Sequence, residues 1–207
     1  MREIRQSGSE GGAAQANASF LPLSSCKGIF MKTIGKGYVH IYTGNGKGKT
    51  SAALGLALRA AGRGLKTHMV QFMKGRHYGE LEGVKTTGGL ITIEQFGHPT
   101  FCKFIETPDP KEVKRACSAL ARIHELMQAH ACVILIADEI ITACMFKLLT
   151  EDDILDVIRV KPEGMELVLT GRGATEGMIE AADLVTEMKE IKHYYAQGVE
   201  AREGIES

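Results

Sequence analysis

The sequence lacks a net charge, a long apolar run and a secretion signal. Lys and Arg together number 25, as do Asp and Glu, so the formal net charge is +0. Nucleic-acid-binding domains are usually basic or carry a basic stripe, so we expect no nucleic-acid partner. No stretch of about 18 apolar residues occurs, so no membrane span is expected. Residues 1–25 are polar and lack the apolar core of a signal peptide. We therefore expect a cytoplasmic protein.

Cysteines are few, odd in number and not paired in the sequence. The chain has 5 of them and no C-x-x-C motif. The expected state is a set of reduced thiols in a cytosolic protein. None lies in a sequence context that would activate it, so no catalytic cysteine is predicted.

What is present fits one folded domain with an extension. The chain has 207 residues, of which 44% are apolar and 24% charged, as is usual for a globular protein that buries a core of its own. Residues 1–30 are polar, low in complexity and without periodicity, and predict a flexible N-terminal extension. Residues 31–207 are the predicted domain.

Apolar, β-branched segments alternate with helical patterns along this domain. Strands are predicted at 38–42, 67–73, 90–95, 132–137, 166–169 and 184–188, and helices at 51–62, 109–129, 150–157 and shortly after 173. Gly62 and Gly64 are predicted to cap the end of the first helix. The polar, glycine-rich stretch 75–90 is predicted to be a loop. The alternation predicts an α/β fold with a mostly parallel sheet covered on both faces.

The strongest motif is TGNGKGKT at residues 43–50, between a predicted strand and a predicted helix. Its glycines let backbone N–H groups turn toward phosphate oxygens, and the helix N-terminus adds partial positive charge. Lys49 supplies a full charge, and the Thr50 hydroxyl suits magnesium. Thr43 stands where the usual motif has its first glycine. The segment predicts binding of ATP and magnesium.

A second motif, ILIADE at residues 134–139, is an apolar run that ends in two acids. P-loop proteins deliver a metal-linked carboxylate from a buried strand in this way. Asp138 or Glu139 would bind magnesium, directly or through water. A strand can also end in a polar residue simply because it reaches solvent, so the motif gains its specificity from the phosphate loop.

Two cations follow predicted strands at the same edge of the sheet. Arg172 lies in the sequence TGRG at residues 170–173, and Lys74 follows the strand at 67–73. Ligands of an open parallel sheet bind at the carboxyl ends of its strands. Arg172 could therefore bind phosphate through its planar fork, with a solvated loop arginine as the alternative. Lys74 is a further candidate anion contact.

Taken together and in this order, the motifs resemble the P-loop ATP:corrinoid adenosyltransferases. The resemblance covers residues 36–206 and rests on GNGKGKT, VQFMKG, ILIADE, LVLTGRG and the terminal GVEAREGIE. The family's own phosphate loop has this compact form, which accounts for Thr43.

The resemblance implies a three-layer, RecA-like P-loop fold and transfer of the 5′-deoxyadenosyl group of ATP to reduced cobalt, with release of triphosphate. It implies magnesium or manganese, a corrinoid substrate, an electron-donating reductase and a homodimer. The family's metal-binding acid carries over to Glu139, beside Asp138. The residues themselves agree with this reaction, because Lys47, Lys49 and Arg172, with the loop N–H groups and magnesium, are suited to stabilise the departing triphosphate. The nucleotide contacts carried over are Gly44, Asn45, Gly46, Lys47, Gly48, Lys49 and Thr50. Ser51 and Lys74 are further candidate contacts.

The chain contains no tryptophan, whereas family members often place aromatic residues, tryptophan included, in the loop that faces the corrinoid. The corresponding stretch is 96–101. Phe96 and Phe101 are the candidates for this role, and we assign Phe101 to substrate binding, with a plain core role as the alternative.

Two other functions stay open. A P-loop kinase or ATPase of another specificity would release ADP instead of triphosphate. A nucleotide-binding regulator would release no product at all.

Removal of residues 1–30 is predicted to leave the fold and ATP binding intact, because this segment has neither periodicity nor a site motif. Thermal unfolding and ATP titration of the truncated chain would check this. A large drop in melting temperature would contradict it, whereas lower activity at unchanged stability would indicate that the extension covers the active site.

Overall fold

A computed structural model describes residues 32–99 and 107–206 of the chain. Its centre is a six-stranded sheet with the order β3-β2-β4-β5-β1-β6, in which every neighbouring pair is parallel. The strands are β1 (Val39–Thr43), β2 (Thr67–Phe72), β3 (Ile91–Phe96), β4 (Ile134–Asp138), β5 (Glu166–Thr170) and β6 (Leu184–Glu187). The α/β fold with a parallel sheet, predicted from the sequence, is confirmed.

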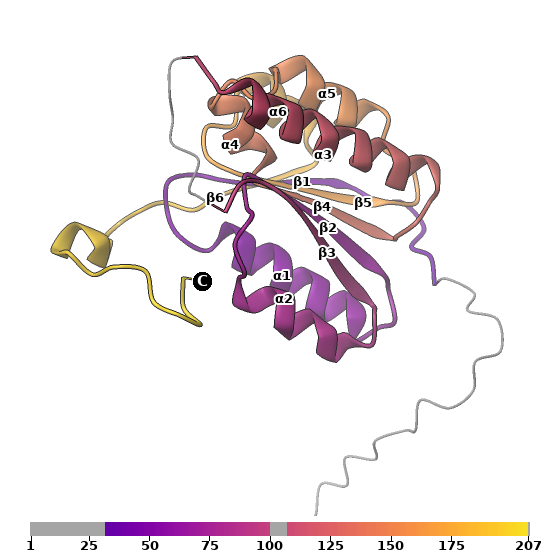
Figure 1. Ribbon diagram of the computed structural model, residues 1–207. Helices are drawn as coiled ribbons and strands as arrows, with labels where there is room; N and C mark the ends of the chain where they lie inside the picture. Colours follow the sequence, from indigo (N-terminus) through magenta and orange to yellow (C-terminus); the bar gives the residue numbers. More distant parts are fainter. Residues whose placement is uncertain (1–31, 100–106, 207) are drawn as a thin grey trace, which may run out of the picture. The chain divides into compact units, whose positions relative to one another are not determined.

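Helices cover both faces of this sheet (Figure 1). On one face lie α1 (Lys49–Ala61) and α2 (Gly79–Gly83), which is followed by the 3-10 turn η1 (Val84–Thr87). On the other lie α3 (Pro110–Gln128), α4 (Ile140–Met145), α5 (Glu151–Arg159) and α6 (Glu176–Ala181). A second 3-10 turn, η2 (Tyr194–Gln197), follows β6. No helix within the described ranges is long and apolar enough to cross a membrane.

The core consists of two apolar layers separated by the sheet. On the α1 face, Met69 and Ile136 pack with Ala53 and Ala57 of the helix. The other face carries the larger layer, in which side chains of β2, β4 and β5 meet α3, α4 and α5. Because both faces are covered, β2 and β4 are buried along their whole length. The sequence of β4 is accordingly an almost continuous apolar run, whereas β2 also buries the polar residues Thr67, His68 and Gln71.

The helical connections between strands lie on one face of the sheet for part of the chain and on the opposite face for the rest. From β1 the chain runs by α1 to β2 on one side, whereas from β4 it runs by α4 and α5 to β5 on the other. Such a switch point leaves a crevice at the carboxyl ends of the strands, where ligands bind in open α/β sheets. The ends of β1, β2, β4 and β5 all meet there.

Two predictions about local structure need correction. The stretch 75–90 is not all loop, because it contains α2 and η1; both are short, and glycines hide the helical pattern. The helix α4 was not predicted, since its six residues directly follow the apolar run of β4. At the end of α1, Gly62 is right-handed (φ −59°) and Gly64 takes the left-handed conformation (φ 73°).

The start of α5 is set by a capping box. The Thr150 hydroxyl accepts a hydrogen bond from Asp153 N (3.2 Å), and the Asp153 carboxylate accepts one from Thr150 N (2.8 Å). Both bonds satisfy backbone N–H groups that a helix start otherwise leaves open.

Replacing Thr150 with Ala is expected to lower the free energy of unfolding by about 1 kcal/mol, because it removes the cap. The melting temperature should fall by about 2–4 °C for a chain of this size, as thermal unfolding would show. Thr150→Ser keeps the hydroxyl and is the control. Equal loss in both variants would mean that the methyl group, and not the cap, is what matters.

Candidate active site

The phosphate loop joins the end of β1 at Thr43 to the start of α1 at Lys49. Gly44 (φ 97°) and Gly48 (φ 117°) have backbone conformations that favour glycine. A Cβ atom at Gly44 would also lie 2.5 Å from the carbonyl oxygen of Met188. Gly48 provides no side-chain cap for α1, so the N–H groups of the first helical turn remain available to an anion.

Lys49 points back into this loop. Its Nζ donates to the carbonyl oxygens of Gly44 (2.8 Å) and Gly46 (2.9 Å), and the residue is only 6% exposed. An ammonium group has three donors, so one N–H is left for a ligand. Burial lowers the pKa of Lys49, and nearby Glu139 acts in the opposite direction. An anion beside Lys49 would therefore stabilise its charged form.

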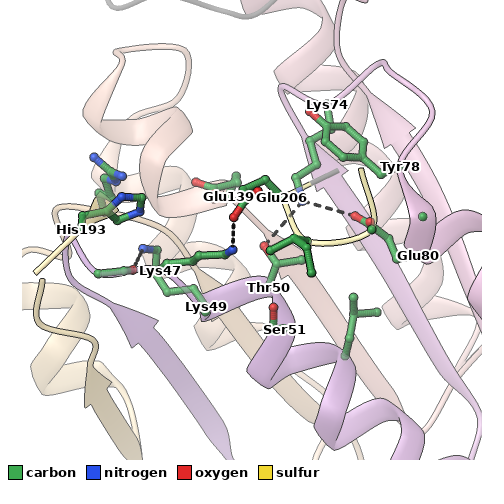
Figure 2. Close-up of a pocket in the computed structure, with 17 residues that line it drawn as sticks. Lys47, Lys49, Thr50, Ser51, Lys74, Tyr78, Glu80, Glu139, His193 and Glu206 are labelled. Carbon is green, nitrogen blue, oxygen red and sulfur yellow. Dashed lines mark hydrogen bonds and ion pairs between the residues drawn. The ribbon is translucent and has the colours of Figure 1, made fainter. Parts of the chain in front are cut away.

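A cavity of about 500 Å³ lies over the loop and the start of α1 (Figure 2). It is framed by side chains from the carboxyl ends of several strands and from the C-terminal segment. The lining includes residues 46–51 of the loop and helix, Leu54, Lys74, residues 78–80, Glu139, Arg172, His193 and residues 204–206.

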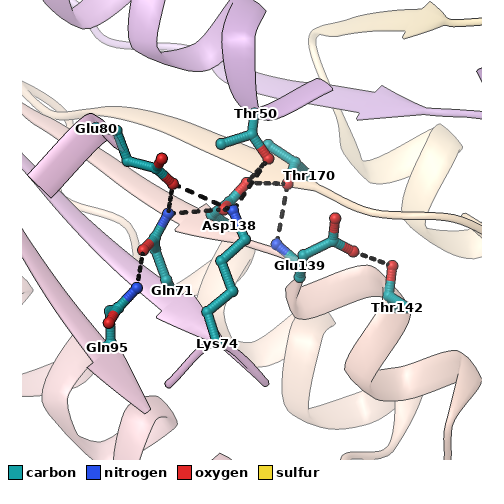
Figure 3. A network of polar contacts seen from close by, with 9 residues as sticks. All are labelled: Thr50, Gln71, Lys74, Glu80, Gln95, Asp138, Glu139, Thr142 and Thr170. Carbon is teal, nitrogen blue, oxygen red and sulfur yellow. Dashed lines mark hydrogen bonds and ion pairs between the residues drawn. The ribbon is translucent and has the colours of Figure 1, made fainter. Parts of the chain in front are cut away.

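The carboxylate of Asp138 lies at the centre of a polar network behind this cavity (Figure 3). It is fully buried and accepts four hydrogen bonds. Oδ1 accepts from the hydroxyls of Thr50 (2.9 Å) and Thr170 (2.8 Å). Oδ2 accepts from Gln71 Nε2 (3.2 Å) and Lys74 Nζ (2.9 Å). Both oxygens are thus satisfied by the protein, so Asp138 orients Thr50 and Lys74 in this arrangement.

Lys74 carries the charge that balances Asp138. Its Nζ also lies 3.6 Å from the carboxylate of Glu80 and 5.3 Å from the centre of the Tyr78 ring. Burial works against the charged form, but the attraction of Asp138 outweighs it and raises the pKa of Lys74. A charged lysine therefore stands at the inner edge of the cavity.

Glu139 differs from Asp138 in that it faces the cavity. It takes a left-handed backbone conformation (φ 63°) directly before α4, and its N–H donates to the Thr170 hydroxyl (2.9 Å). Its Oε2 accepts from the Thr142 hydroxyl, whereas Oε1 has no hydrogen-bond partner among the described residues. In residues 32–99 and 107–206, no group of three or more His, Cys, Asp or Glu is arranged to hold a metal.

Arg172 is brought to the same cavity by a close approach of two elements. A Cβ atom at Gly171 would lie 2.4 Å from Thr142 N, and Arg172 N donates to the Thr142 hydroxyl (2.9 Å). Arg172 also borders a second cavity of about 330 Å³, whose other walls include Phe72, Met73, Met145 and Phe146. The two cavities share Lys74, Tyr78, Glu139 and Arg172.

The structure brings most of the predicted site residues together. Gly46 to Ser51, Lys74, Glu139 and Arg172 line the larger cavity, and Asp138 supports it from behind. Gly44 and Asn45 belong to the loop but not to the lining. Phe101 lies outside the described residues, and Phe96 ends β3.

Several site residues were missed from the sequence. Tyr78 and Glu80 belong to the stretch that was predicted to be a loop, and Glu206 belongs to the terminal segment that carried only a family resemblance. Gln71 was overlooked inside β2, although a polar residue in an otherwise buried strand is a signal that calls for a partner.

The amino-acid sequence of the chain matches that of a known protein family. Residues 35–207 match the family described as ATP:corrinoid adenosyltransferase BtuR/CobO/CobP. A corrinoid adenosyltransferase of Pseudomonas aeruginosa is 34% identical over 178 residues, which are 83% of this chain and 84% of that protein. One from a Sinorhizobium species is 35% identical over 189 residues, 84% of this chain and 82% of that protein.

The fold also resembles that of a solved structure, a KaiC-like protein of Pyrococcus horikoshii. The TM-score is 0.51 at 18% identity, with 74% of this chain and 73% of that chain covered. At this identity the likeness concerns the fold alone, and it agrees with a RecA-like P-loop architecture. From the match over residues 35–207 and the identity to these relatives, the chain belongs to the ATP:corrinoid adenosyltransferase family.

Proposed function

We propose that this protein transfers the 5′-deoxyadenosyl group of ATP to the reduced cobalt of a corrinoid and releases triphosphate. The observation that carries the proposal is the pair of adjoining cavities in a chain of this family. One is built around a phosphate loop, the other has apolar walls, and four side chains border both. The cavity at the phosphate loop suits the charged triphosphate, and the adjoining cavity with apolar walls suits the apolar macrocycle.

The proposed reaction needs no strong general base. Cobalt in its +1 state attacks C5′ with an electron pair, which becomes the cobalt–carbon bond, and cobalt reaches the +3 state. The bond between C5′ and the α-phosphate oxygen breaks, and its electron pair leaves with the triphosphate. The protein must hold C5′ in line with cobalt and stabilise the charge that develops on the leaving group.

The positive groups of the larger cavity suit the second task. Lys49 has one N–H that the loop carbonyls do not use, and the N-terminal turn of α1 offers further donors. Arg172, two residues after the end of β5, lines the same cavity. These groups surround the place where the negative charge of a triphosphate would lie, which supports their assignment to the leaving group.

The residues present also fit magnesium or manganese. The Thr50 hydroxyl donates its proton to Asp138 and accepts only a long hydrogen bond from Lys74 Nζ (3.5 Å), so a lone pair remains for a cation. Glu139 has a carboxylate oxygen without a partner among the described residues. Thr50 and Glu139 would hold the metal, with Asp138 orienting Thr50. Hard oxygen ligands of this kind, completed by phosphate oxygens, are typical of magnesium sites. When bound, the metal would help to neutralise the triphosphate.

The remaining assignments rest on the family resemblance. We infer that an electron-donating reductase supplies cob(I)alamin or a related corrinoid in reduced form, and that the enzyme works as a cytoplasmic homodimer. Phe101 stays a predicted corrinoid contact.

The products distinguish this function from that of a kinase or ATPase. With ATP, magnesium and a chemically reduced corrinoid, we expect intact triphosphate and one adenosylated corrinoid per ATP. Phosphorus NMR and the absorbance spectrum of the corrinoid would measure both. ADP and phosphate formed without a corrinoid would contradict the proposal but leave the phosphate-loop assignment standing.

Replacing Lys49 with Ala is expected to lower kcat/KM by about a hundredfold or more, because a preorganised positive group at the leaving triphosphate is lost. Steady-state kinetics would measure the loss, and circular dichroism would show that the fold survives. Lys85→Ala changes an exposed lysine of η1 and is the matched control. Near-normal turnover of a folded Lys49→Ala protein would refute the role of Lys49.

A further inference from the structure

The C-terminal segment returns to the phosphate loop after β6. Gly204, Ile205 and Glu206 form part of the wall of the larger cavity (Figure 2). The contact is made by a carboxylate: Glu206 Oε1 lies 2.6 Å from Nζ of Lys47, a residue of the loop itself. A carboxylate from the end of the described chain therefore lies in the cavity wall, in contact with a lysine of the phosphate loop.

Three side chains hold this carboxylate. Lys47 and the Tyr194 hydroxyl donate to Oε1, and the guanidinium of Arg202 reaches both oxygens at 3.3 Å. The N–H of Arg202 donates to Oε2 as well (2.8 Å). Arg202, Lys47 and Tyr194 hold the pKa of Glu206 well below its usual range, so the group is an anion at neutral pH.

The side chains of Lys47, Tyr194 and Arg202, which bind this carboxylate, are also suited to bind a phosphate group. Lys47 Nζ and the Arg202 guanidinium lie over the same Tyr194 ring, at 5.7 Å and 4.9 Å from its centre. An ammonium, a planar fork and a hydroxyl bind phosphate oxygens in the same way as carboxylate oxygens. Lys47 is two residues before Lys49, so this subsite adjoins the place proposed for the triphosphate.

We propose that Glu206 is an internal competitor of the triphosphate. Its carboxylate occupies an anion subsite formed by Lys47, Arg202 and Tyr194. A phosphate group displaces the carboxylate from this subsite when ATP binds, and the carboxylate rebinds there when triphosphate dissociates. A carboxylate and a phosphate repel each other at such a distance, so they do not occupy the subsite together. The inference deepens the proposed function and rests on it.

The exchange has a use in turnover. Triphosphate carries several negative charges and every positive group of the cavity retains it, so its release is a difficult step. When Glu206 returns to Lys47 and Arg202, these two cations no longer hold the product. The carboxylate thereby weakens binding of both ATP and triphosphate.

Inorganic tripolyphosphate, titrated with magnesium into the full chain, tests the exchange. Glu206→Gln keeps the size of the side chain but removes its charge, and we expect tripolyphosphate to bind about fivefold more tightly and to dissociate more slowly. Fivefold corresponds to the upper end of the range for exposed ion pairs. In the adenosyl-transfer assay, KM for ATP should fall, and kcat should fall too if release limits turnover.

Glu203→Gln is the matched control, because Glu203 is an exposed acid of the same segment outside the cavity lining and should leave the affinity unchanged. In the Glu206→Gln background, a further Arg202→Gln change should weaken tripolyphosphate binding, since Arg202 then contacts the phosphate. If Glu206→Gln binds tripolyphosphate no more tightly than the unaltered chain, the competition is refuted. If Arg202→Gln has no effect in that background, the subsite is refuted.

Failure of the proposed function gives a different result. A chain that binds tripolyphosphate more tightly after Glu206→Gln, yet adenosylates no corrinoid, would support the exchange and contradict the function. A chain that adenosylates a corrinoid, but binds tripolyphosphate equally tightly before and after Glu206→Gln, would support the function and contradict the exchange.

Discussion

The buried carboxylate of Asp138 is the constraint on which the site depends. A buried charge must be paired and hydrogen-bonded, and here the partners come from α1, β2, the turn after β2 and β5. Removing one partner of such a pair typically costs about 3–5 kcal/mol, because the other charge is left buried without compensation. The position of Thr50, at the start of α1, is thereby tied to the ends of three strands.

This constraint also explains why the neighbouring acids Asp138 and Glu139 have different roles. Asp138 is the last residue of β4 and is fixed from all sides. Glu139, one residue later, turns out of the sheet through a left-handed backbone conformation and presents its carboxylate to the cavity. A single strand end thus provides one acid that organises the site and one that faces the ligand.

Much of this arrangement could be predicted from the sequence, because its signals are local. The phosphate loop is a short motif, and β4 is an apolar run that ends in acids. The sequence did not reveal the short helices α2 and α4, because α2 begins and ends in glycine and α4 directly follows the apolar run of β4. Nor did it reveal the contact of Lys47 with Glu206, which are far apart in sequence and meet only through tertiary folding. Tyr78 and Glu80 were missed for the same reason: their role depends on where α2 packs.

The phosphate loop is completed by the opposite end of the chain. Met188 N donates to the Thr43 carbonyl (2.8 Å), and Gly46 N donates to the Met188 carbonyl (2.7 Å), so residues just beyond the last strand fix the loop that follows the first. During synthesis, β1 and the loop leave the ribosome long before residue 188 has been made. Since β1 pairs only with β5 and β6 among the described strands, the nucleotide site acquires its final shape only when nearly the whole domain is available. An interrupted chain that ends before β6 would contain the complete phosphate-loop sequence and still lack the backbone contacts that shape it.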